Sequence, residues 1–285
     1  MKVAILNRER TWEGGDLIAI DATMTALREL GVDCWYGNAR PLREADLVHI
    51  FHVNYPWSRE NFRLATVAAK PYVVTPTFYP VDRGMAPAEM ASHLRRAAAV
   101  LPFSHTEGHE MQAWVGAKIP YTPIPNGTSK IFHAPDGGPG RVGVAAVAVR
   151  ADDGKRWEVI RDACQELEIP FTFLTGLSRE DLAAEYKRHR VLVSSSSTER
   201  MSLVIGEALC AGCRVISTSA NRGNEWYGPG LQTISPEGSV ALFKSHIHPA
   251  YNSVDWDWSP NTYARNLTWD LVATQLLKVY QKVIC

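Results

Sequence analysis

Two glutamates in the second half of the chain, Glu199 and Glu207, are the residues with the clearest chemical use. They stand in residues 194–216, SSSSTERMSLVIGEALCAGCRVI, where a polar loop leads into an apolar, helix-like run that stops at Gly212. Seven residues separate the two carboxylates, about two helical turns, so both can line one wall of a site. Glu207 lies among apolar residues, where a carboxylate is costly unless a ligand or partner bonds it. Glu199 alternatively is a first-turn charge that complements the helix dipole.

Cations and glycines supply two candidate anion sites. Arg150 and Lys155 are five residues apart in a loop after a predicted strand, so they can place two positive charges against a leaving anion. The alternative is that both are solvated loop cations. Gly14 and Gly15 open the first predicted helix. Free N–H groups at a helix N-terminus bind anions, and glycine lets the backbone approach them closely.

The sequence offers little that would bind a metal. Asp152 and Asp153 are adjacent rather than spaced as Asp-x-Asp, and we predict that they cap the following helix. Cys210 and Cys213 have CxxC spacing, but no second cysteine or histidine pair accompanies them. We therefore predict a helix end at Cys210, a strand start at Cys213 and no bound metal. The five cysteines are odd in number and scattered, which fits a reducing cytoplasm.

Composition narrows the class of protein. The 285 residues include 30 Lys and Arg against 30 Asp and Glu, and 46% are hydrophobic, as in an ordinary globular protein. Zero formal net charge argues against a polyanion binder that works by bulk electrostatics. No apolar run reaches the ~18–20 residues of a membrane helix, and the charges that follow MKVAIL argue against a signal peptide. We expect a cytoplasmic protein of two domains or one large α/β unit.

Short apolar runs alternate with helix-like stretches, which is typical of parallel α/β sheets. A segment with three Gly and two Pro, residues 134–140, interrupts the pattern and is predicted to be an interdomain linker. We predict two doubly wound, Rossmann-like domains that face each other across a cleft at the carboxyl ends of their sheets. The domains span residues 1–133 and 141–266, and a closing helix spans residues 267–285. Strands are predicted at residues 3–6, 33–36, 47–51, 72–75 and 100–103, and at 141–149, 171–175, 191–194, 214–218 and 231–234.

The motifs together resemble a known family. Glu-x7-Glu followed by Ala-x-x-x-Gly-x-x-Val-Ile resembles the retaining GT-B glycosyltransferases of family 4, also called glycosyl transferases group 1. The resemblance extends in order over nearly the whole chain, and implies an N-terminal acceptor-side domain and a C-terminal domain that binds a nucleotide sugar. Its further matches are Gly14 and Gly15, residues 45–49 and 99–104, Pro125 to Gly127 with Phe132, Arg150 with Lys155, Asn224 with Glu225, and Trp269 to Tyr280.

The resemblance implies a role for each candidate. Glu207 would bond the ribose hydroxyls of the nucleotide, and Glu199 would lie near the donor sugar and the reacting centre. Arg150 and Lys155 would stabilise the charge that develops on the diphosphate, so the catalytic candidates are Glu199, Arg150 and Lys155. No cofactor would be bound permanently and no metal would be needed; the donor substrate would be a UDP- or GDP-sugar. The donor-binding set is Gly14, Gly15, Arg150, Lys155, Glu199, Met201, Ser202, Leu203 and Glu207.

The chain departs from the family pattern in two places. Where the family has Gly-Phe-Gly after the first glutamate, this chain has Arg200, Met201 and Ser202. Arg200 would then either read the donor sugar or simply face solvent. The family often has a histidine after its fourth strand, where this chain has TPTFY from Thr75 onward. His105 is a weak catalytic candidate in its place.

The expected activity is retaining transfer of a sugar from a nucleotide-diphosphate donor to a hydroxyl acceptor, without a catalytic metal. The acceptor could be a glycan, a lipid, a small molecule or a modified base in phage-type DNA. By the resemblance, the leaving phosphate would take the acceptor's proton, so no separate base is needed. Two alternatives use the same scaffold: a nucleotide-sugar 2-epimerase, and a non-catalytic nucleotide-sugar-binding protein.

Overall fold

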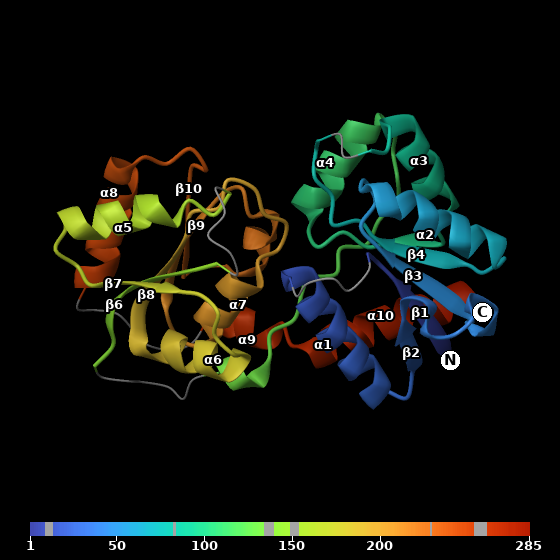
Figure 1. Ribbon diagram of the computed structural model, residues 1–285, viewed down its shortest axis with the longest axis horizontal. Coiled ribbons are helices and arrows are strands. Elements are labelled where there is room, and N and C mark those ends of the chain that lie inside the picture. Colours follow the sequence, from blue (N-terminus) through green and yellow to red (C-terminus); the bar gives the residue numbers. More distant parts are fainter. Residues whose placement is uncertain (9–13, 82–83, 134–139, 149–153, 229, 254–260) are drawn as a thin grey trace. The chain divides into compact units, whose positions relative to one another are not determined.

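The computed structural model describes residues 1–8, 14–81, 84–133, 140–148, 154–228, 230–253 and 261–285. They form two compact units: unit 1 comprises Met1–Asn126 and Trp269–Cys285, and unit 2 comprises Gly127–Thr268. In the described residues, each unit has a parallel sheet of five strands with helices on both faces (Figure 1). The predicted α/β class with two Rossmann-like domains is therefore confirmed.

The sheet of unit 1 is built from short apolar runs that are buried on both faces, as parallel strands require. Its strand order is β2-β1-β3-β4-β5. In register, Ile5 lies between Tyr36 and His49 of the two neighbouring strands. The strands are β1 (Lys2–Leu6), β2 (Asp33–Tyr36), β3 (Leu47–Phe51), β4 (Tyr72–Thr75) and β5 (Ala99–Val100).

The helices of unit 1 cover the two faces of this sheet as two groups (Figure 1). One face packs on residues such as Ile20, Leu27 and Leu276, and the other on Phe62, Met90 and Met111. The first group is α1 (Gly15–Glu29) and α10 (Trp269–Ile284). The second group is α2 (Pro56–Val67), α3 (Pro87–Arg96) and α4 (His105–Val115), and the short 3-10 helices η1 (Gly37–Ala39) and η2 (Leu42–Glu44) follow β2.

A buried histidine fastens α10 to this sheet. His49 on β3 is fully buried, and its Nδ1 lies 2.6 Å from the hydroxyl of Tyr280 on α10. Its Nε2 lies 2.9 Å from Thr75 Oγ1 at the end of β4. Burial lowers the pKa of His49 to about 3, so the imidazole is neutral and serves as one donor and one acceptor.

Unit 2 repeats the same sheet topology. Its strand order, β10-β9-β8-β6-β7, is the mirror listing of the order in unit 1, so the first strand of each unit lies between the second and the third. Val144 on β6 pairs with Phe171 on one side and with Val191 on the other. The strands are β6 (Val142–Val147), β7 (Phe171–Leu174), β8 (His189–Ser194), β9 (Arg214–Thr218) and β10 (Leu231–Ile234).

The helices of unit 2 also cover both faces of their sheet (Figure 1). Ile160, Phe243 and Ile247 form the core between the sheet and the α5 and α8 pair. On that face lie α5 (Trp157–Glu166) and α8 (Val240–Asn252). The remaining helices are α6 (Arg179–Arg188), α7 (Leu203–Cys210), α9 (Thr262–Asn266), η3 (Lys130–Phe132) and η4 (Arg222–Trp226).

The chain passes between the units twice, after Asn126 and after Thr268. The first crossing precedes the predicted boundary at residue 133 because residues after Asn126 already pack in unit 2. There, Thr128 donates its backbone N–H to Leu267 O at 2.7 Å, and Phe132 is fully buried. The closing helix predicted from residue 267 begins at Trp269 and belongs to unit 1. Of the predicted linker, residues 134–139 lie outside the described residues.

Candidate functional site

The strand order of unit 2 indicates where a ligand can bind at the edge of its sheet. β6 has β7 on one side and β8 on the other, so the loops that follow β6 and β8 leave in opposite directions. In open α/β sheets, ligands bind at this switch point, outside the carboxyl ends of the strands. Lys155 lies in the loop after β6 and Glu199 in the loop after β8. Two predicted site residues therefore flank the switch point.

Lys155 and Glu199 form an ion pair there, with 2.8 Å between Nζ and Oε2. Their side chains are 33% and 17% exposed, so the pair is accessible but partly shielded. Two hydrogen bonds to backbone carbonyl groups also join the two loops. Ser195 Oγ donates to the carbonyl of Lys155 at 2.7 Å, and Ser197 N–H donates to Gly154 O at 3.0 Å. The structure thus brings together one predicted cation and the predicted donor-sugar carboxylate.

Asn221, which sequence reasoning missed, holds the segment between the two glutamates. Glu199 pairs with Asn221 as an isolated bridge, and the Asn221 Oδ1 accepts the backbone N–H of Ser202 at 3.0 Å. Asn221 is 3% exposed. Its only sequence signal is a polar residue shortly after the end of β9. It orients the chain immediately before α7.

The N-terminus of α7 carries three further predicted donor-site residues. Ser202 is the N-cap, Leu203 is the first helical residue, and Met201 precedes them. The Ser202 side chain makes no capping hydrogen bond, and the first N–H groups of a helix without such a cap can bind an anion. Met201 and Leu203 are buried, and only Ser202 of the three is half-buried. A contribution of Leu203 to a ligand would therefore come from the backbone, whereas the backbone N–H of Ser202 is already donated to Asn221.

Glu207 occupies the fifth position of α7 and is 2% exposed. Arg179, the first residue of α6, forms an ion pair with it through both guanidinium Nη atoms. Burial raises the pKa of the Glu207 carboxyl above its usual value, and the charge and hydrogen bonds of Arg179 oppose that rise. Arg179 is thus a partner of the kind that the apolar surroundings of Glu207 required.

Sequence reasoning missed Arg179, although a signal existed. Cations near a helix N-terminus oppose the helix dipole, and Arg179 stands at the first position of α6 ahead of Glu180 and Asp181. Its guanidinium carbon lies 4.6 Å from the ring centroid of Phe132, which is fully buried. The guanidinium is therefore held between an aromatic face and a carboxylate.

The Arg200 side chain is buried, in contrast to one of its two sequence interpretations. One sequence interpretation placed its side chain in solvent, but Arg200 is 3% exposed, so that interpretation is wrong. Its backbone N–H donates to Glu199 Oε1 at 3.2 Å, which ties the residue to the neighbouring carboxylate. The structure thus places Arg200 inside unit 2 rather than in solvent.

The remaining predicted residues are placed as follows. Gly14 is the N-cap of α1 and Gly15 its first residue, both in unit 1. A Cβ built on Gly15 would meet no atom of the described residues within 4 Å. Arg150 lies outside the described residues, as do Asp152 and Asp153. His105 is the exposed first residue of α4.

Cys210 and Cys213 lie where the sequence predicted, at the end of α7 and directly before β9. Both are buried free thiols, and burial raises their pKa values to about 11 and about 12. Such thiols are inert as nucleophiles at neutral pH. Across the described residues, no group of three or more His, Cys, Asp or Glu side chains is arranged to hold a metal ion.

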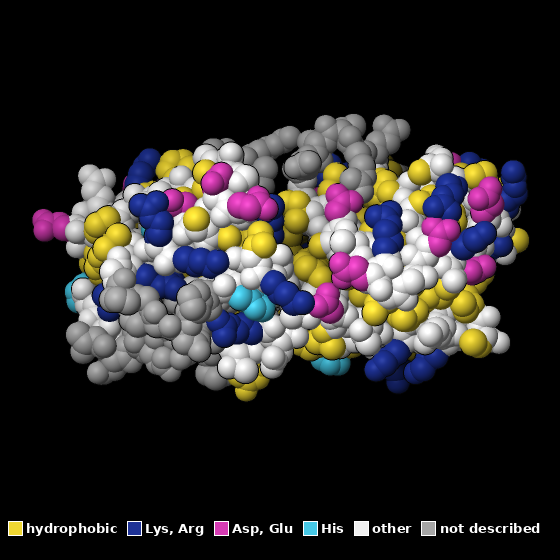
Figure 2. Space-filling view, turned by 90° about the horizontal axis from the view of Figure 1, so that it is seen from below, with side chains coloured by type: hydrophobic (Ala, Val, Ile, Leu, Met, Phe, Trp, Pro, Cys, Tyr) yellow, Lys and Arg dark blue, Asp and Glu magenta, His cyan; other side chains and the backbone are white. Residues whose placement is uncertain are grey.

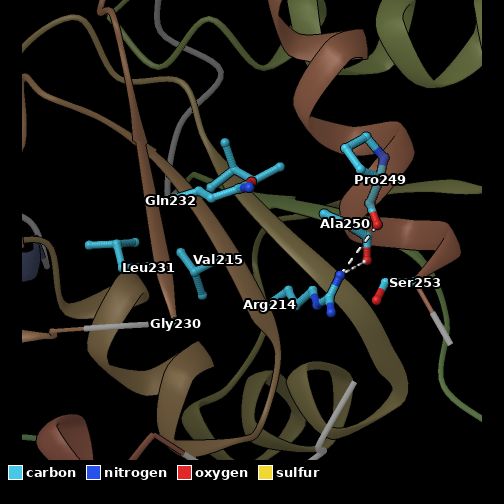
Figure 3. Close-up of a pocket in the computed structure, with 9 residues that line it drawn as sticks. Arg214, Val215, Gly230, Leu231, Gln232, Pro249, Ala250 and Ser253 are labelled. Carbon is cyan, nitrogen blue, oxygen red and sulfur yellow. Dashed lines mark hydrogen bonds between the residues drawn. The ribbon is translucent and has the colours of Figure 1, made fainter. Parts of the chain in front are cut away.

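A cavity of about 400 Å³ lies at the opposite edge of the unit 2 sheet (Figure 3). It is lined by the first residues of β9 and β10 and by the end of α8. Arg214 points across it and donates to Ala250 O at 2.9 Å. None of the predicted site residues lines this cavity, so it is separate from the switch point.

The face seen in Figure 2 shows basic and acidic side chains interspersed, in keeping with the balanced composition. Within the part of the chain that the structure describes, no helix is long and apolar enough to cross a membrane.

Two Rossmann-like units with the same strand order define the GT-B class of glycosyltransferase fold. Solved structures with this architecture align with 99% of the chain in each case. Anabaena HepE in complex with UDP and glucose has a TM-score of 0.75, 13% identity and 100% of its own chain covered. Sucrose-phosphate synthase from Thermosynechococcus elongatus has a TM-score of 0.78, 16% identity and 98% covered. A glycosyltransferase from Rickettsia africae has a TM-score of 0.74, 12% identity and 98% covered.

Sequence comparison finds a family model that matches part of unit 2. Residues 146–250 match the family model described as glycosyl transferases group 1, and these residues include Lys155, Arg179, Glu199 and Glu207. No curated protein sequence matches the chain. Residues 146–250 are thus similar to glycosyl transferases group 1, and the fold of the chain is that of the GT-B glycosyltransferases.

Proposed function

We propose that the chain transfers a sugar from a UDP-sugar to a hydroxyl group of an acceptor, with retention of anomeric configuration and without a catalytic metal. The observation that carries this proposal is the arrangement at the switch point of unit 2. An uncapped helix N-terminus, a lysine paired with Glu199, and a buried Glu207 meet around one segment of chain. These groups match, in order, a diphosphate, a leaving-group charge and a ribose.

Among the described residues, Lys155 is the proposed cation that would stabilise the charge developing on the leaving group. When the bond between sugar and diphosphate breaks, negative charge grows on the diphosphate, and a nearby ammonium stabilises it more in the transition state than in the ground state. In the ligand-free chain Lys155 is already neutralised by Glu199 at 2.8 Å. A bound donor would share the Lys155 ammonium with Glu199. Glu199 would thereby hold the ammonium in place beside the sugar. Arg150 is proposed as the second cation.

Glu199 and the backbone before α7 would then bind the donor sugar. Glu199 is 17% exposed, so one carboxylate can accept from Lys155 and from a sugar hydroxyl. Leu203 would present its backbone N–H to the diphosphate or the sugar, and Met201 and Ser202 would line the same part of the site. Gly14 and Gly15 would contribute the N-terminus of α1. The leaving phosphate would accept the proton of the acceptor hydroxyl.

UDP is preferred over GDP as the nucleotide because HepE, whose fold this chain shares, has been solved with UDP and with UDP-glucose. The test is a panel of UDP- and GDP-sugars in thermal unfolding, followed by product analysis. A donor at 100 times its Kd stabilises the folded state by about 2.7 kcal/mol. We expect a UDP-sugar to stabilise the chain most, and transfer with retention to persist in EDTA. Stabilisation by GDP-sugars alone, an inverted product, or activity that needs added Mg²⁺ would each contradict the corresponding part of the proposal.

A further inference from the structure

Arg179 and Glu207 meet in a two-pronged contact across two helices of unit 2. Arg179 Nη2 donates to Glu207 Oε1, and Nη1 donates to Oε2 at 3.3 Å. Glu207 is 2% exposed, whereas the arginine side chain is 31% exposed. Each oxygen of the carboxylate thus accepts from one prong of a planar fork, which fixes the plane of the carboxylate as well as its position.

The helix that carries Arg179 does not benefit from it. Ser178 caps α6 by accepting the backbone N–H of Asp181 at 3.1 Å, and the acidic side chains of Glu180 and Asp181 suit the positive end of the helix dipole. A guanidinium at the first position opposes that dipole. Its favourable contacts are therefore with Glu207 and with the face of Phe132, 4.6 Å away. These contacts hold the fork in one orientation.

The contact leaves part of the carboxylate available. An ionised carboxylate has about four lone-pair sites, two on each oxygen. Among the described residues, Arg179 occupies one site on each oxygen of Glu207, which leaves each oxygen the capacity to accept one more hydrogen bond. Two adjacent acceptors of this kind match two hydroxyl groups on neighbouring carbon atoms, as in a ribose.

We propose that Arg179 is a positioning residue of the donor site, which orients Glu207 so that its two oxygens accept from the 2′ and 3′ hydroxyls of the ribose. This inference rests on the proposed function, in which Glu207 bonds the ribose. Arg179 itself touches neither the ribose nor the reacting atoms. It makes the site selective for a ribonucleotide, because a 2′-deoxyribose leaves one oxygen of a buried carboxylate without a donor.

The charges around Glu207 make its ionisation depend on Arg179. Tyr186 on α6, Tyr227 after η4 and Cys210 on α7 face it as neutral groups, since burial raises the pKa of each. Arg265 on α9 acts on Cys210. Arg179 is the cation that lowers the pKa of Glu207. Without it, burial would leave the carboxyl protonated nearer to neutral pH, where it accepts hydrogen bonds less well.

The experiment is calorimetric titration of the full chain with UDP and with 2′-deoxy-UDP, between pH 7 and pH 9. We expect the native chain to bind UDP at least tenfold more tightly than 2′-deoxy-UDP, with little change over this pH range. Arg179→Met should bind UDP at least tenfold more weakly and lose most of the discrimination. Its UDP affinity should recover as pH rises and Glu207 ionises. Arg179→Lys keeps the charge without the fork, so its affinity should stay independent of pH while its discrimination falls.

Arg188→Met, an exposed change on the same helix, is the matched control and should behave as the native chain. Arg179→Met leaves a buried charge unpaired and can fail to fold. In that case Arg179→Lys and the double variant Arg179→Met with Glu207→Gln decide, since the double variant should bind UDP no more weakly than Glu207→Gln alone. Native-like discrimination in Arg179→Lys, or additive losses in the double variant, would overturn the role of Arg179. A native chain that binds neither UDP nor GDP would instead refute the proposed function.

Discussion

Each unit buries a glutamate on a helix that follows a sheet strand, and the two are satisfied in different ways. Glu107 in unit 1 is fully buried, and its carboxylate accepts the backbone N–H groups of Phe78 and Phe103, each at 2.6 Å. Glu207 in unit 2 is almost as deeply buried, but its partner is the side chain of Arg179, which is 31% exposed. The first carboxylate joins two loops of the fold, whereas the second is held by a residue at the surface.

Under the proposed function, this comparison separates a carboxylate that stabilises the fold from one that serves a site. Backbone N–H groups cannot turn away, so Glu107 fixes the loop after β4 against the start of α4. An arginine fork neutralises Glu207 and still leaves acceptor sites for a ligand. Burial alone therefore does not distinguish the two glutamates, whereas the type of partner does.

The largest expected effect concerns stability. Glu107→Gln keeps the shape but can accept only one of the two backbone N–H groups, and its amide would face the other. Hydrogen bonds to a charged group contribute about 1.5–3 kcal/mol, so we expect the free energy of unfolding to fall by about 3 kcal/mol. Urea denaturation measures this loss. UDP affinity should stay within about twofold of the native value, because Glu107 and the proposed UDP site are independent of each other.

The control for this variant is Glu60→Gln, which removes an exposed charge paired with Arg63 and should change stability little. If Glu107→Gln weakened UDP binding as much as a change at Glu207, the distinction between the two glutamates would fail.

Catalysis gives the next effect. Glu199 is shared between Lys155 and solvent, so it resembles Glu207 in having capacity for a ligand. Glu199→Gln should lower turnover by about 10²-fold, which corresponds to about 2.7 kcal/mol of lost transition-state interaction, and should leave UDP affinity nearly intact. Initial rates with the identified donor, together with calorimetry, measure the two quantities. Equal losses in turnover and in UDP affinity would indicate that Glu199 contacts the nucleotide rather than the sugar.

Acid should lower the free energy of unfolding by about 2 kcal/mol through His49 of unit 1. His49 has a pKa of about 3 in the folded state and about 6.5 when unfolded. Because the unfolded chain binds the proton first, stability is lost as pH falls below about 6.5. At pH 5 the loss from this one group is about 2 kcal/mol. Urea denaturation at pH 8 and pH 5 should show that His49→Gln loses less stability than the native chain between these two values. His105→Gln, an exposed change, should retain the native slope; an identical slope in His49→Gln would show that this histidine is not buried as a neutral group.

The sequence predicted local structure well and long-range partners poorly. Glu207 was recognisable because an isolated carboxylate interrupts an apolar helix. Arg179 was not, because its 28-residue separation from Glu207 is closed only by the packing of α6 on α7. Glu107 shows the same limit. Ser104 and Glu107 have the spacing of a helix N-terminus, and Ser104 does cap α4, but the Glu107 side chain turns to Phe78, 29 residues away.

Errors in element boundaries also have local physical causes. The predicted strand over residues 100–103 is shorter in the structure, where β5 ends at Val100. Leu101 still donates its N–H to Val74 O at 2.7 Å, but Pro102 has no N–H with which to continue the ladder. The linker was predicted at the Gly- and Pro-rich residues 134–140, although the chain changes unit after Asn126, within the sequence Pro-Asn-Gly.

The return of α10 to unit 1 has a consequence for biosynthesis. A ribosome makes all of unit 2 before it makes Trp269–Ile284, so unit 2 can be complete while unit 1 still lacks a helix. Until then, the sheet face that packs on Leu276 and Tyr280 is uncovered, and His49 has no phenol to bond. Exposed apolar surface of this kind makes a nascent chain prone to aggregate. The unit that is started first is therefore the last to be finished.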